Sequence, residues 1–230
     1  MKYKIAIFDL DGTLLDTLQD LAISTNFALE ASGYPKRTLQ EIRSFVGNGI
    51  EKLIERAVPA TVSAEERKRT LDIFKEHYAK HCEDRTAPYE GILTLLDHLI
   101  EAGLPIAVVS NKIDFAVQTL CEKFFGTRIA IAVGEREGIR RKPYPDSVLE
   151  VLRKVDIAPS EAVYIGDSEV DILTATNAGM DMIIVTWGFR DRDFLVNEGA
   201  TVLADSADRL ESLLLSESAR KSEKNMDKFQ

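Results

Sequence analysis

The sequence has few cysteines, no long apolar run and no excess of positive charge. Its two cysteines, Cys82 and Cys121, lie far apart and form no Cys-x-x-Cys pair, so we interpret both as reduced packing residues and not as a disulfide or a metal clip. No apolar run approaches the ~20 residues of a membrane-spanning helix. The chain enters its first predicted strand directly after Met1-Lys2-Tyr3, which leaves no room for a secretory leader. We therefore expect a cytoplasmic protein with no membrane partner.

The balance of charge argues against one class of partner. With 29 Lys and Arg against 38 Asp and Glu, the net charge is −9, whereas electrostatic binding to nucleic acid needs Lys and Arg to meet the phosphates. A small phosphorylated ligand needs only a local positive site and stays compatible with this charge. The 230 residues, 45% of them hydrophobic, are enough for one α/β domain, or for a core with a smaller inserted domain.

Strands and helices alternate over most of the chain. Nearly unbroken apolar runs, typical of strands buried on both faces of a parallel sheet, occur at 4–8, 104–109, 128–133, 162–165 and 182–185. Such alternation predicts right-handed crossovers, which bring the carboxyl ends of the strands to one edge of the sheet. We therefore predict an α/β fold: a Rossmann-like parallel sheet of five or six strands flanked by helices.

One segment interrupts this alternation. Between residues 16 and 84 the periodicity is helical, with predicted helices over 18–29, 39–46, 50–57 and 64–82. Helices alone within the first crossover indicate an inserted helical domain. We therefore predict a discontinuous core formed by 1–15 and 85–230, with a helical insert at 16–84 that hangs over the end of the first strand. The polar, Ser- and Lys-rich end of the chain predicts a flexible tail at 217–230.

Acidic side chains follow the first predicted strand. Asp9 and Asp11 come where the chain leaves the sheet, and ligands of parallel α/β sheets bind beyond the carboxyl ends of the strands. Like charges this close oppose each other's ionisation unless a cation such as Mg²⁺ shares the site. Gly12 permits a positive φ and the close approach of a ligand, and Thr13 adds a hydroxyl. One alternative is an ordinary Asp-Gly turn capped by Thr13. An EF-hand loop fits less well, because it needs its glycine at the sixth position, whereas Gly12 is the fourth residue counted from Asp9.

Further polar side chains follow the later strands. Ser110 and Asn111 end the second predicted strand, Asp167 and Asp171 follow the fourth, and Lys142 precedes a proline-initiated helix. Taken singly, Ser110-Asn111 and Asp167 are equally well explained as helix caps, and Lys142 as a solvated charge. Their joint occurrence at strand ends favours a ligand site at the edge where the first acidic pair lies.

Two other motifs carry weaker signals. Gly47-Asn48-Gly49, between two predicted helices, could cradle an anion with its N–H groups, but a plain interhelix turn explains it as well. His77 and His81 lie four residues apart on a helix, and Cys82 follows them. No Glu follows the first His and no third ligand lies at metal spacing, so we prefer a polar helix face over a zinc site.

In order and spacing, the strand-end residues resemble the four motifs of the haloacid dehalogenase-like hydrolases. The motifs are Asp9-Leu10-Asp11-Gly12-Thr13, Ser110-Asn111, Lys142-Pro143 and Gly166-Asp167-Ser168-Glu169-Val170-Asp171. The helical insert is similar to the small helical cap of that family. Within the superfamily the chain is most similar to phosphoglycolate phosphatases, through Phe45-Val46-Gly47-Asn48-Gly49 in the insert and Val185-Thr186-Trp187-Gly188-Phe189 after the fifth strand.

This resemblance implies a Mg²⁺-dependent phosphatase of small phosphate monoesters. In such an enzyme Asp9 attacks phosphorus and carries a transient aspartyl-phosphate, while Asp11 protonates the leaving alcohol and later deprotonates the attacking water. The ion is held by the Asp9 carboxylate, the Asp11 carbonyl and Asp167, and Asp171 positions Lys142 or a water at the metal. The resemblance assigns the phosphoryl oxygens to Lys142, Ser110, Asn111, Gly12 and Thr13.

In the same scheme the insert excludes water and selects the leaving group. We predict hinges near 15–16 and 86–88 that let it close over the substrate. We expect Arg43, Asn48 and Lys52 to face the cleft, where one of them meets a carboxylate of the leaving group.

Three rival functions stay open at this point. A β-phosphoglucomutase-like phosphosugar mutase on the same scaffold shares the aspartyl-phosphate but returns the phosphoryl group to sugar. A metal-free dehalogenase needs no acid two residues after its nucleophile, whereas Asp11 is present. A receiver-type signalling module also gathers acids, a hydroxyl and a lysine around a phosphorylated Asp, but it is smaller and has no helical insert. The natural substrate and the choice between monomer and homodimer stay open as well.

Overall fold

A parallel six-stranded sheet forms the centre of the protein. The structure, a computed structural model, describes residues 2–216, so the predicted tail at 217–230 lies outside the described residues. The strands follow the order β5-β4-β1-β6-β7-β8, and every neighbouring pair is parallel. They are β1 (Ile5–Phe8), β4 (Ile106–Ile113), β5 (Ile131–Glu135), β6 (Ala162–Gly166), β7 (Asp181–Val185) and β8 (Leu203–Ala204). This confirms the predicted α/β fold, with six strands in the sheet.

Strand β1 lies in the middle of the sheet because its side chains are apolar on both faces. Residues 5–8 are at most 1% exposed. Ala6 and Phe8 pack on one face of the sheet, and Ile5 and Ile7 pack on the other. Strands β4 and β6 pair with its two edges. The residue that follows β1, Asp9, therefore emerges at the centre of the carboxyl edge.

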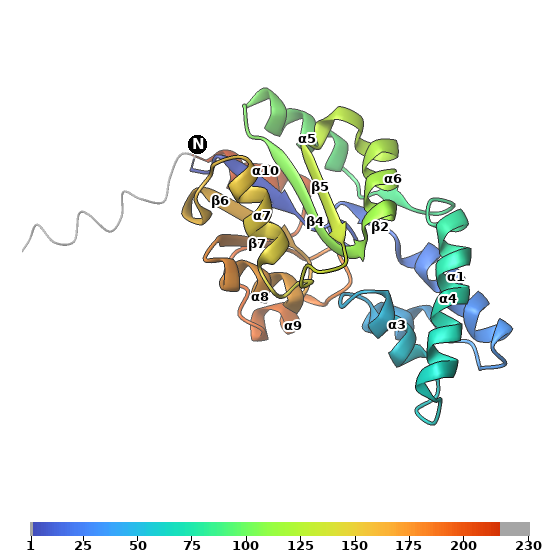
Figure 1. The fold of residues 1–230 in the computed structure, drawn as a ribbon. Helices are drawn as coiled ribbons and strands as arrows, with labels where there is room; N and C mark the ends of the chain where they lie inside the picture. The colour runs from blue at the N-terminus through green and yellow to red at the C-terminus, as the bar shows by residue number, and fades with distance from the viewer. Residues whose placement is uncertain (1, 217–230) are drawn as a thin grey trace, which may run out of the picture.

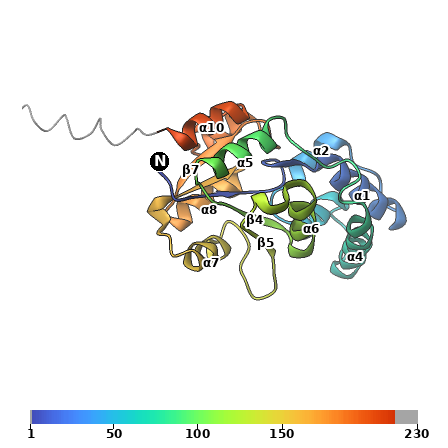
Figure 2. The same cartoon turned by 90° about the horizontal axis from the view of Figure 1, so that it is seen from above.

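Helices cover both faces of the sheet. Figure 2 shows α5 and α10 on one side and α7 on the other. Apolar residues of α5, α6 and α10 share a core cluster with Ala6 and Phe8, and apolar residues of α7 share one with Ile5, Ile7 and the α8 residues Ala175 and Ala178. The bounds are α5 (Ile92–Glu101), α6 (Asp114–Phe125), α7 (Asp146–Lys154), α8 (Glu169–Ala178), α9 (Arg192–Asn197) and α10 (Ala207–Leu215). Among residues 2–216, none of these helices, nor any other, combines the length and the hydropathy required to cross a membrane.

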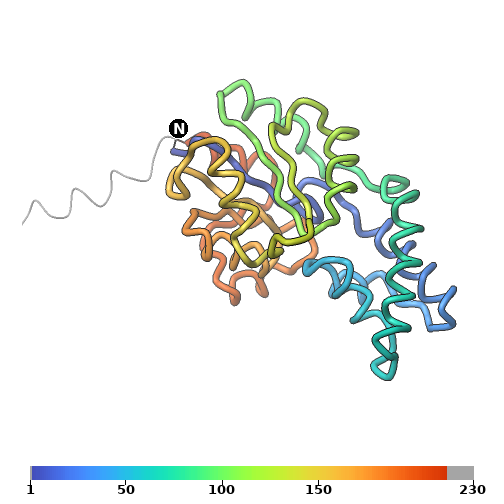
Figure 3. The backbone as a smooth tube through the Cα atoms, viewed as in Figure 1, coloured from blue at the N-terminus to red at the C-terminus, as the bar shows by residue number. Residues whose placement is uncertain are grey.

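Four helices follow β1 before the sheet resumes. They are α1 (Leu18–Ala31), α2 (Leu39–Phe45), α3 (Ile50–Ala57) and α4 (Ala64–His81). Figures 1 and 3 show them grouped beyond the carboxyl ends of β4 and β5. Helix α2 starts at a capping box, in which Thr38 Oγ1 accepts from the Glu41 N–H and the Glu41 carboxylate accepts from the Thr38 N–H. The helices expected at 39–46, 50–57 and 64–82 are confirmed to within one residue.

Two short strands join this helical group to the sheet. β2 (Leu15–Asp16) pairs antiparallel with β3 (Ala87–Pro88), so the chain enters and leaves the helical group through adjacent segments. Strands of two residues are too short to produce a periodic pattern in the sequence, so neither strand could be predicted from it.

Asp20 holds these two connections together. Its side chain, on the first turn of α1, is buried and accepts hydrogen bonds from the Arg85 N–H at 3.0 Å and the Thr86 N–H at 2.9 Å. The Thr86 hydroxyl donates to the same carboxylate at 2.8 Å. One buried carboxylate thus ties the start of the helical group to its end.

We expect Asp20→Ala to lower the free energy of unfolding by about 2–4 kcal/mol, because three donors would lose their acceptor in a buried place. Asp20→Asn keeps one acceptor oxygen and should lose less. Urea unfolding measures the effect, with Asp72→Ala on the exposed face of α4 as the matched control. Equal unfolding midpoints for Asp20→Ala and Asp72→Ala would show that Asp20 does not tie the two segments.

Candidate active site

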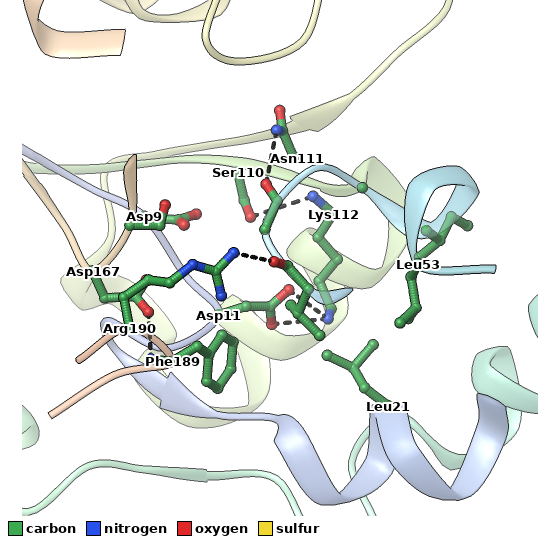
Figure 4. Close-up of a pocket in the computed structure, with 15 residues that line it drawn as sticks. Asp9, Asp11, Leu21, Leu53, Ser110, Asn111, Lys112, Asp167, Phe189 and Arg190 are labelled. Carbon is green, nitrogen blue, oxygen red and sulfur yellow. Dashed lines mark hydrogen bonds and ion pairs between the residues drawn. The ribbon is translucent and has the colours of Figure 1, made fainter. Parts of the chain in front are cut away.

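Acidic side chains and lysines gather where β1, β4 and β6 end. The three strands are neighbours in the sheet, so side chains far apart in the sequence come together at one edge (Figure 4). Asp9 and Asp11 follow β1, Lys112 lies near the end of β4, Asp167 and Asp171 follow β6, and Lys142 comes from the loop before α7.

Lys142 joins two of these acids. Its Nζ lies 2.9 Å from Asp9 Oδ1 and 2.8 Å from Asp171 Oδ1, and it donates to the Tyr164 hydroxyl at 3.0 Å. Burial by itself lowers the pKa of Lys142, but the carboxylates of Asp171 and Asp9 outweigh it and hold this pKa well above its usual value. Lys142 therefore presents a permanent positive charge beside Asp9.

Asp171 fixes the geometry around it with both carboxylate oxygens. While Oδ1 contacts Lys142, Oδ2 accepts from the N–H groups of Asp167 and Ser168 at 3.2 and 3.1 Å, and from the Ser168 hydroxyl at 2.6 Å. Asp171 thus lies at the start of α8 with its carboxylate shared between Lys142 and the turn that carries Asp167.

Asp167 is a buried acid without a cationic partner. Its carboxylate accepts from the Phe189 N–H at 2.7 Å and from the Thr13 hydroxyl at 3.3 Å, and among residues 2–216 no lysine or arginine forms an ion pair with it. Burial raises the pKa of Asp167 well above its usual value, and the carboxylates of Asp171 and Asp9 raise it further. A bound cation would relieve this cost.

The acids are arranged as ligands of a small cation. One carboxylate oxygen each from Asp9, Asp167 and Asp171 lie within 4.8 Å of one another. Burial raises the pKa of Asp9 to about 6 against the opposing effect of Lys142. A set of oxygen donors with more negative than positive charge fits a hard divalent ion such as Mg²⁺. The main support for a bound cation is Asp167, a buried carboxylate that has no lysine or arginine partner among residues 2–216.

The turn after β1 leaves no room for side chains beside Asp167. Gly12 has φ +81°, and a Cβ on it would lie 2.4 Å from Asp167 Oδ2. A Cβ on Gly188 would lie 2.4 Å from the Cβ of Asp167. Both positions therefore require glycine, because the two loops pack directly against the acid.

Gly12 and Thr13, predicted to bind the phosphoryl group, both donate their N–H groups within the turn after β1. The Gly12 N–H donates to the Leu15 carbonyl at 2.9 Å and the Thr13 N–H donates to the Leu10 carbonyl at 3.3 Å. The tight turn after β1 thus consumes both N–H groups. The Thr13 hydroxyl, which contacts Asp167, acts on the acid cluster.

Ser110 and Asn111 lie in the wall of the cavity above the acids. The Asn111 amide donates to the Lys142 carbonyl at 3.0 Å and to the Gly47 carbonyl at 3.3 Å. It therefore links the end of β4 both to the lysine loop and to the helical insert. Ser110 is the better placed of the two predicted phosphate ligands on β4. Its hydroxyl oxygen accepts a hydrogen bond from the Lys112 N–H at 3.3 Å, and its hydroxyl proton stays available to donate to a ligand.

Lys112 is a site residue that was not predicted from the sequence motifs. Its Nζ donates to both oxygens of Asp11, at 2.9 and 3.0 Å, and to the Tyr78 hydroxyl of α4. Burial lowers the pKa of Lys112, but Asp11 and Tyr78 outweigh this and leave the pKa above its usual value. The only signal in the sequence is its position, directly after Ser110-Asn111 at a strand end.

A cavity with about 550 Å³ of empty space, part of it open to solvent, lies between the acids and the helical insert. The insert lines it with the apolar side chains of Leu21, Val46, Ile50 and Leu53. Arg190, from the loop after β7, lines the same cavity and donates to the Val46 carbonyl at 2.8 Å. The reacting end of the cavity is thus polar and its other end is mostly apolar.

The structure contradicts the expectation that Arg43, Asn48 and Lys52 face this cavity. Arg43 reaches the Gly188 carbonyl and Asp191, Asn48 accepts from Arg56, and Lys52 pairs with Glu55, and none of the three lines the cavity. For Lys52 the reason is the orientation of α3, because the face that carries Ile50 and Leu53 packs inward and leaves Lys52 on the solvent side. Arg43 and Asn48 are held by their own partners outside the cavity.

The site combines a lysine with buried acids at the carboxyl edge of a parallel sheet, and a helical insert covers it. This arrangement is typical of one family of enzymes. The chain belongs to the haloacid dehalogenase-like hydrolases, whose family model matches residues 6–185. This confirms the resemblance found in the sequence motifs. Within that family the chain is a phosphatase, an enzyme that hydrolyses small phosphate esters.

Its relatives include several phosphoglycolate phosphatases. The protein of that name from Agrobacterium fabrum (strain C58) is 35% identical over 209 residues, which are 88% of this chain and 89% of that protein. The one from Mesorhizobium japonicum is 34% identical over 208 residues, 89% and 92% of the two chains. The crystal structure of a candidate phosphoglycolate phosphatase from Lactobacillus delbrueckii subsp. bulgaricus is 42% identical, with a TM-score of 0.90 over 94% of this chain and 100% of that one.

Proposed function

We propose that this phosphatase uses Asp9 as its nucleophile and Mg²⁺ as its cofactor, and that its substrate is a small phosphate monoester related to phosphoglycolate. The observation that carries the proposal is the arrangement at β1: Asp9 lies 2.9 Å from the buried Lys142 and beside Asp167, a buried acid that lacks a cation. The names of the relatives favour phosphoglycolate as the first substrate to test.

The residues would divide the reaction into two transfers. An Asp9 carboxylate oxygen forms a bond to phosphorus while the bond from phosphorus to the leaving oxygen breaks, and the proton of the Asp11 carboxyl group goes to that oxygen. A water oxygen then attacks the aspartyl-phosphate, its proton goes to Asp11, and inorganic phosphate and the Asp9 carboxylate are released. Lys142 and Ser110 hold the phosphoryl oxygens and balance the charge that develops on them.

The divalent ion would be held by the carboxylates of Asp9 and Asp167 and by the main-chain carbonyl of Asp11. When bound, it neutralises the acids and orients the phosphoryl group for attack. Asp171, whose oxygen lies within 4.8 Å of those of the other two acids, keeps Lys142 and the Asp167 turn in place around that position.

We also propose that residues 16–84 act as a cap on a core made of 1–15 and 85–230. Two core side chains hold neighbouring carbonyl groups of the same insert loop: Arg190 binds that of Val46 and Asn111 binds that of Gly47. Leu21, Ile50 and Leu53 then face the reacting groups with apolar surface. A cap closed in this way would exclude water from the phosphoryl group until the leaving alcohol has gone.

A panel of phosphate monoesters tests the substrate proposal. We expect Mg²⁺-dependent release of inorganic phosphate, with a kcat/KM for phosphoglycolate at least about tenfold above those for sugar phosphates, because the apolar side chains of the insert that line the cavity offer no hydrogen-bond partners to the hydroxyl groups of a sugar. Release is measured for each ester with Mg²⁺ and with a chelator.

Two results would contradict this proposal in different ways. Conversion of glucose 1-phosphate to an isomer without release of phosphate would identify a mutase on the same scaffold. An acyl-phosphate on Asp9 that persists far longer than a turnover would identify a signalling module.

A further inference from the structure

Lys112 connects the helical insert to Asp11. An ammonium group has three N–H donors, and the structure gives this one three acceptors: Asp11 Oδ1 at 2.9 Å, Asp11 Oδ2 at 3.0 Å and the Tyr78 hydroxyl at 2.5 Å. Lys112 is 3% exposed and Tyr78 is 2% exposed. Lys112 and Tyr78 are therefore shielded from water, whereas the side chain of Asp11 is 15% exposed and lines the cavity.

The two sides of this contact come from different parts of the protein. Lys112 belongs to β4 in the sheet, whereas Tyr78 belongs to α4 in the insert. The Tyr78 ring is held by a stacked contact with Phe74, with 5.2 Å between ring centroids. Movement of the insert away from the sheet would thus remove the third partner of Lys112.

Asp11 lies on the side of the cavity where the leaving oxygen of a substrate would be. In Figure 4 the side chains of Asp11 and Lys112 lie between Asp9 on one side and Leu21 and Leu53 on the other. An in-line attack by Asp9 places the leaving oxygen on the far side of phosphorus, toward the apolar end of the cavity. Lys112 holds the Asp11 carboxyl group on that side.

Building on the proposed function, we propose that Lys112 is a positioning residue that places the Asp11 carboxyl group at the leaving oxygen, and that Tyr78 makes this placement depend on the closed position of the insert. Proton transfer to the leaving group would then be available only when the insert covers the substrate. The cap would act on the chemical step through this contact, in addition to excluding water.

The proposal makes a distinction between two kinds of substrate. An alkoxide is a poor leaving group, so cleavage of an alkyl phosphate needs the proton of a correctly placed Asp11. The p-nitrophenolate anion leaves without a proton. A defect in the placement of Asp11 should therefore slow transfer from alkyl phosphates and spare transfer from p-nitrophenyl phosphate.

Single-turnover kinetics with Tyr78→Phe and Lys112→Met test this distinction. With phosphoglycolate and Mg²⁺, we expect the rate of alcohol release to fall about tenfold in Tyr78→Phe and about 10²- to 10³-fold in Lys112→Met, with little change in KM. The single-turnover rate of p-nitrophenolate release from p-nitrophenyl phosphate should change less than about threefold in either variant. Tyr34→Phe and Lys154→Met, which change the same atoms away from the cavity, are the controls and should behave as wild type.

Several results would overturn the proposal. Equal losses with both esters would mean that the two residues serve phosphate binding or folding, a rise in KM alone would mean substrate binding, and unchanged rates would mean no role. Thermal unfolding of each variant is recorded beside the kinetics, and Tyr78→Phe, which keeps the ring, decides the matter if Lys112→Met fails to fold. An Asp9→Asn variant that releases p-nitrophenolate at the wild-type rate would instead overturn the proposed function, and this inference with it.

Discussion

Asp9→Asn is expected to lower kcat by at least about 10⁴-fold while the protein stays folded. The amide has nearly the shape of the carboxylate, but its oxygen is a poor nucleophile and cannot carry the phosphoryl group as an acyl-phosphate. Lys142 keeps its contact with Asp171 at 2.8 Å, so the lysine should remain in place when Asp9 loses its charge. The measurement is phosphate release with Mg²⁺, beside thermal unfolding.

The same substitution should not destabilise the protein. Burial raises the pKa of Asp9 to about 6, which means that the ionised carboxylate is costly in the folded state, and the amide removes that cost. Asp146→Asn, at the surface pair with Arg140, is the matched control. Undiminished phosphate release by Asp9→Asn would rule out the nucleophile assigned here.

Removal of Mg²⁺ is expected to abolish turnover, and Asp167→Asn is expected to raise the Mg²⁺ concentration for half-maximal activity by about 10²-fold or more. Asp167 is the buried acid without a cationic partner, so it has the most to gain from a bound ion. Activity is measured over a titration of Mg²⁺ after treatment with a chelator. Wild-type activity after exhaustive chelation, or superimposable titrations of the two proteins, would contradict the metal site.

Stability supplies a second measurement of the same site. For a carboxyl group whose pKa is higher folded than unfolded, the folded state binds more protons between the two values, so stability falls as pH rises through that window. For Asp9 the window runs from its ordinary 3.8 to about 6, and the raised pKa of Asp167 adds a contribution of the same sign. We expect Mg²⁺ to raise the unfolding temperature of the wild type above pH 6, and to do so much less in Asp167→Asn.

The ends of the strands could be predicted from the sequence because they depend on local patterns of residues. The apolar run at 4–8 and the acids after it are a strand and its exit, and parallel pairing then brings the other strand ends to the same edge. The sequence alone therefore predicts that the motif residues Asp9, Lys142 and Asp167 lie at one edge of the sheet. Helix positions in the insert were equally accessible, since the 3.6-residue period and the caps at Thr38 and Ser63 are local as well.

The direction of individual side chains depended on the tertiary structure. Arg43, Asn48 and Lys52 have the charge or polarity expected of a substrate-binding surface, but each is engaged elsewhere: Arg43 by Gly188 and Asp191, Asn48 by Arg56, and Lys52 by Glu55. The N–H groups of Gly12 and Thr13 are consumed by the tight turn itself. Neither result follows from residue type or spacing, because both depend on how close two backbones approach.

The amino-acid sequence by itself determined the family, the α/β architecture and the acids and lysine of the chemical site, because each is encoded in short apolar runs and in residues next to strand ends. The tertiary structure alone decided which groups link the insert to that site. The contact of Lys112 with Asp11 and Tyr78 and the four hydrogen bonds to Asp20 join residues that are at least 34 positions apart. Contacts of this kind depend on how the helical group packs against the sheet, and this packing cannot be read from the spacing of residues along the sequence.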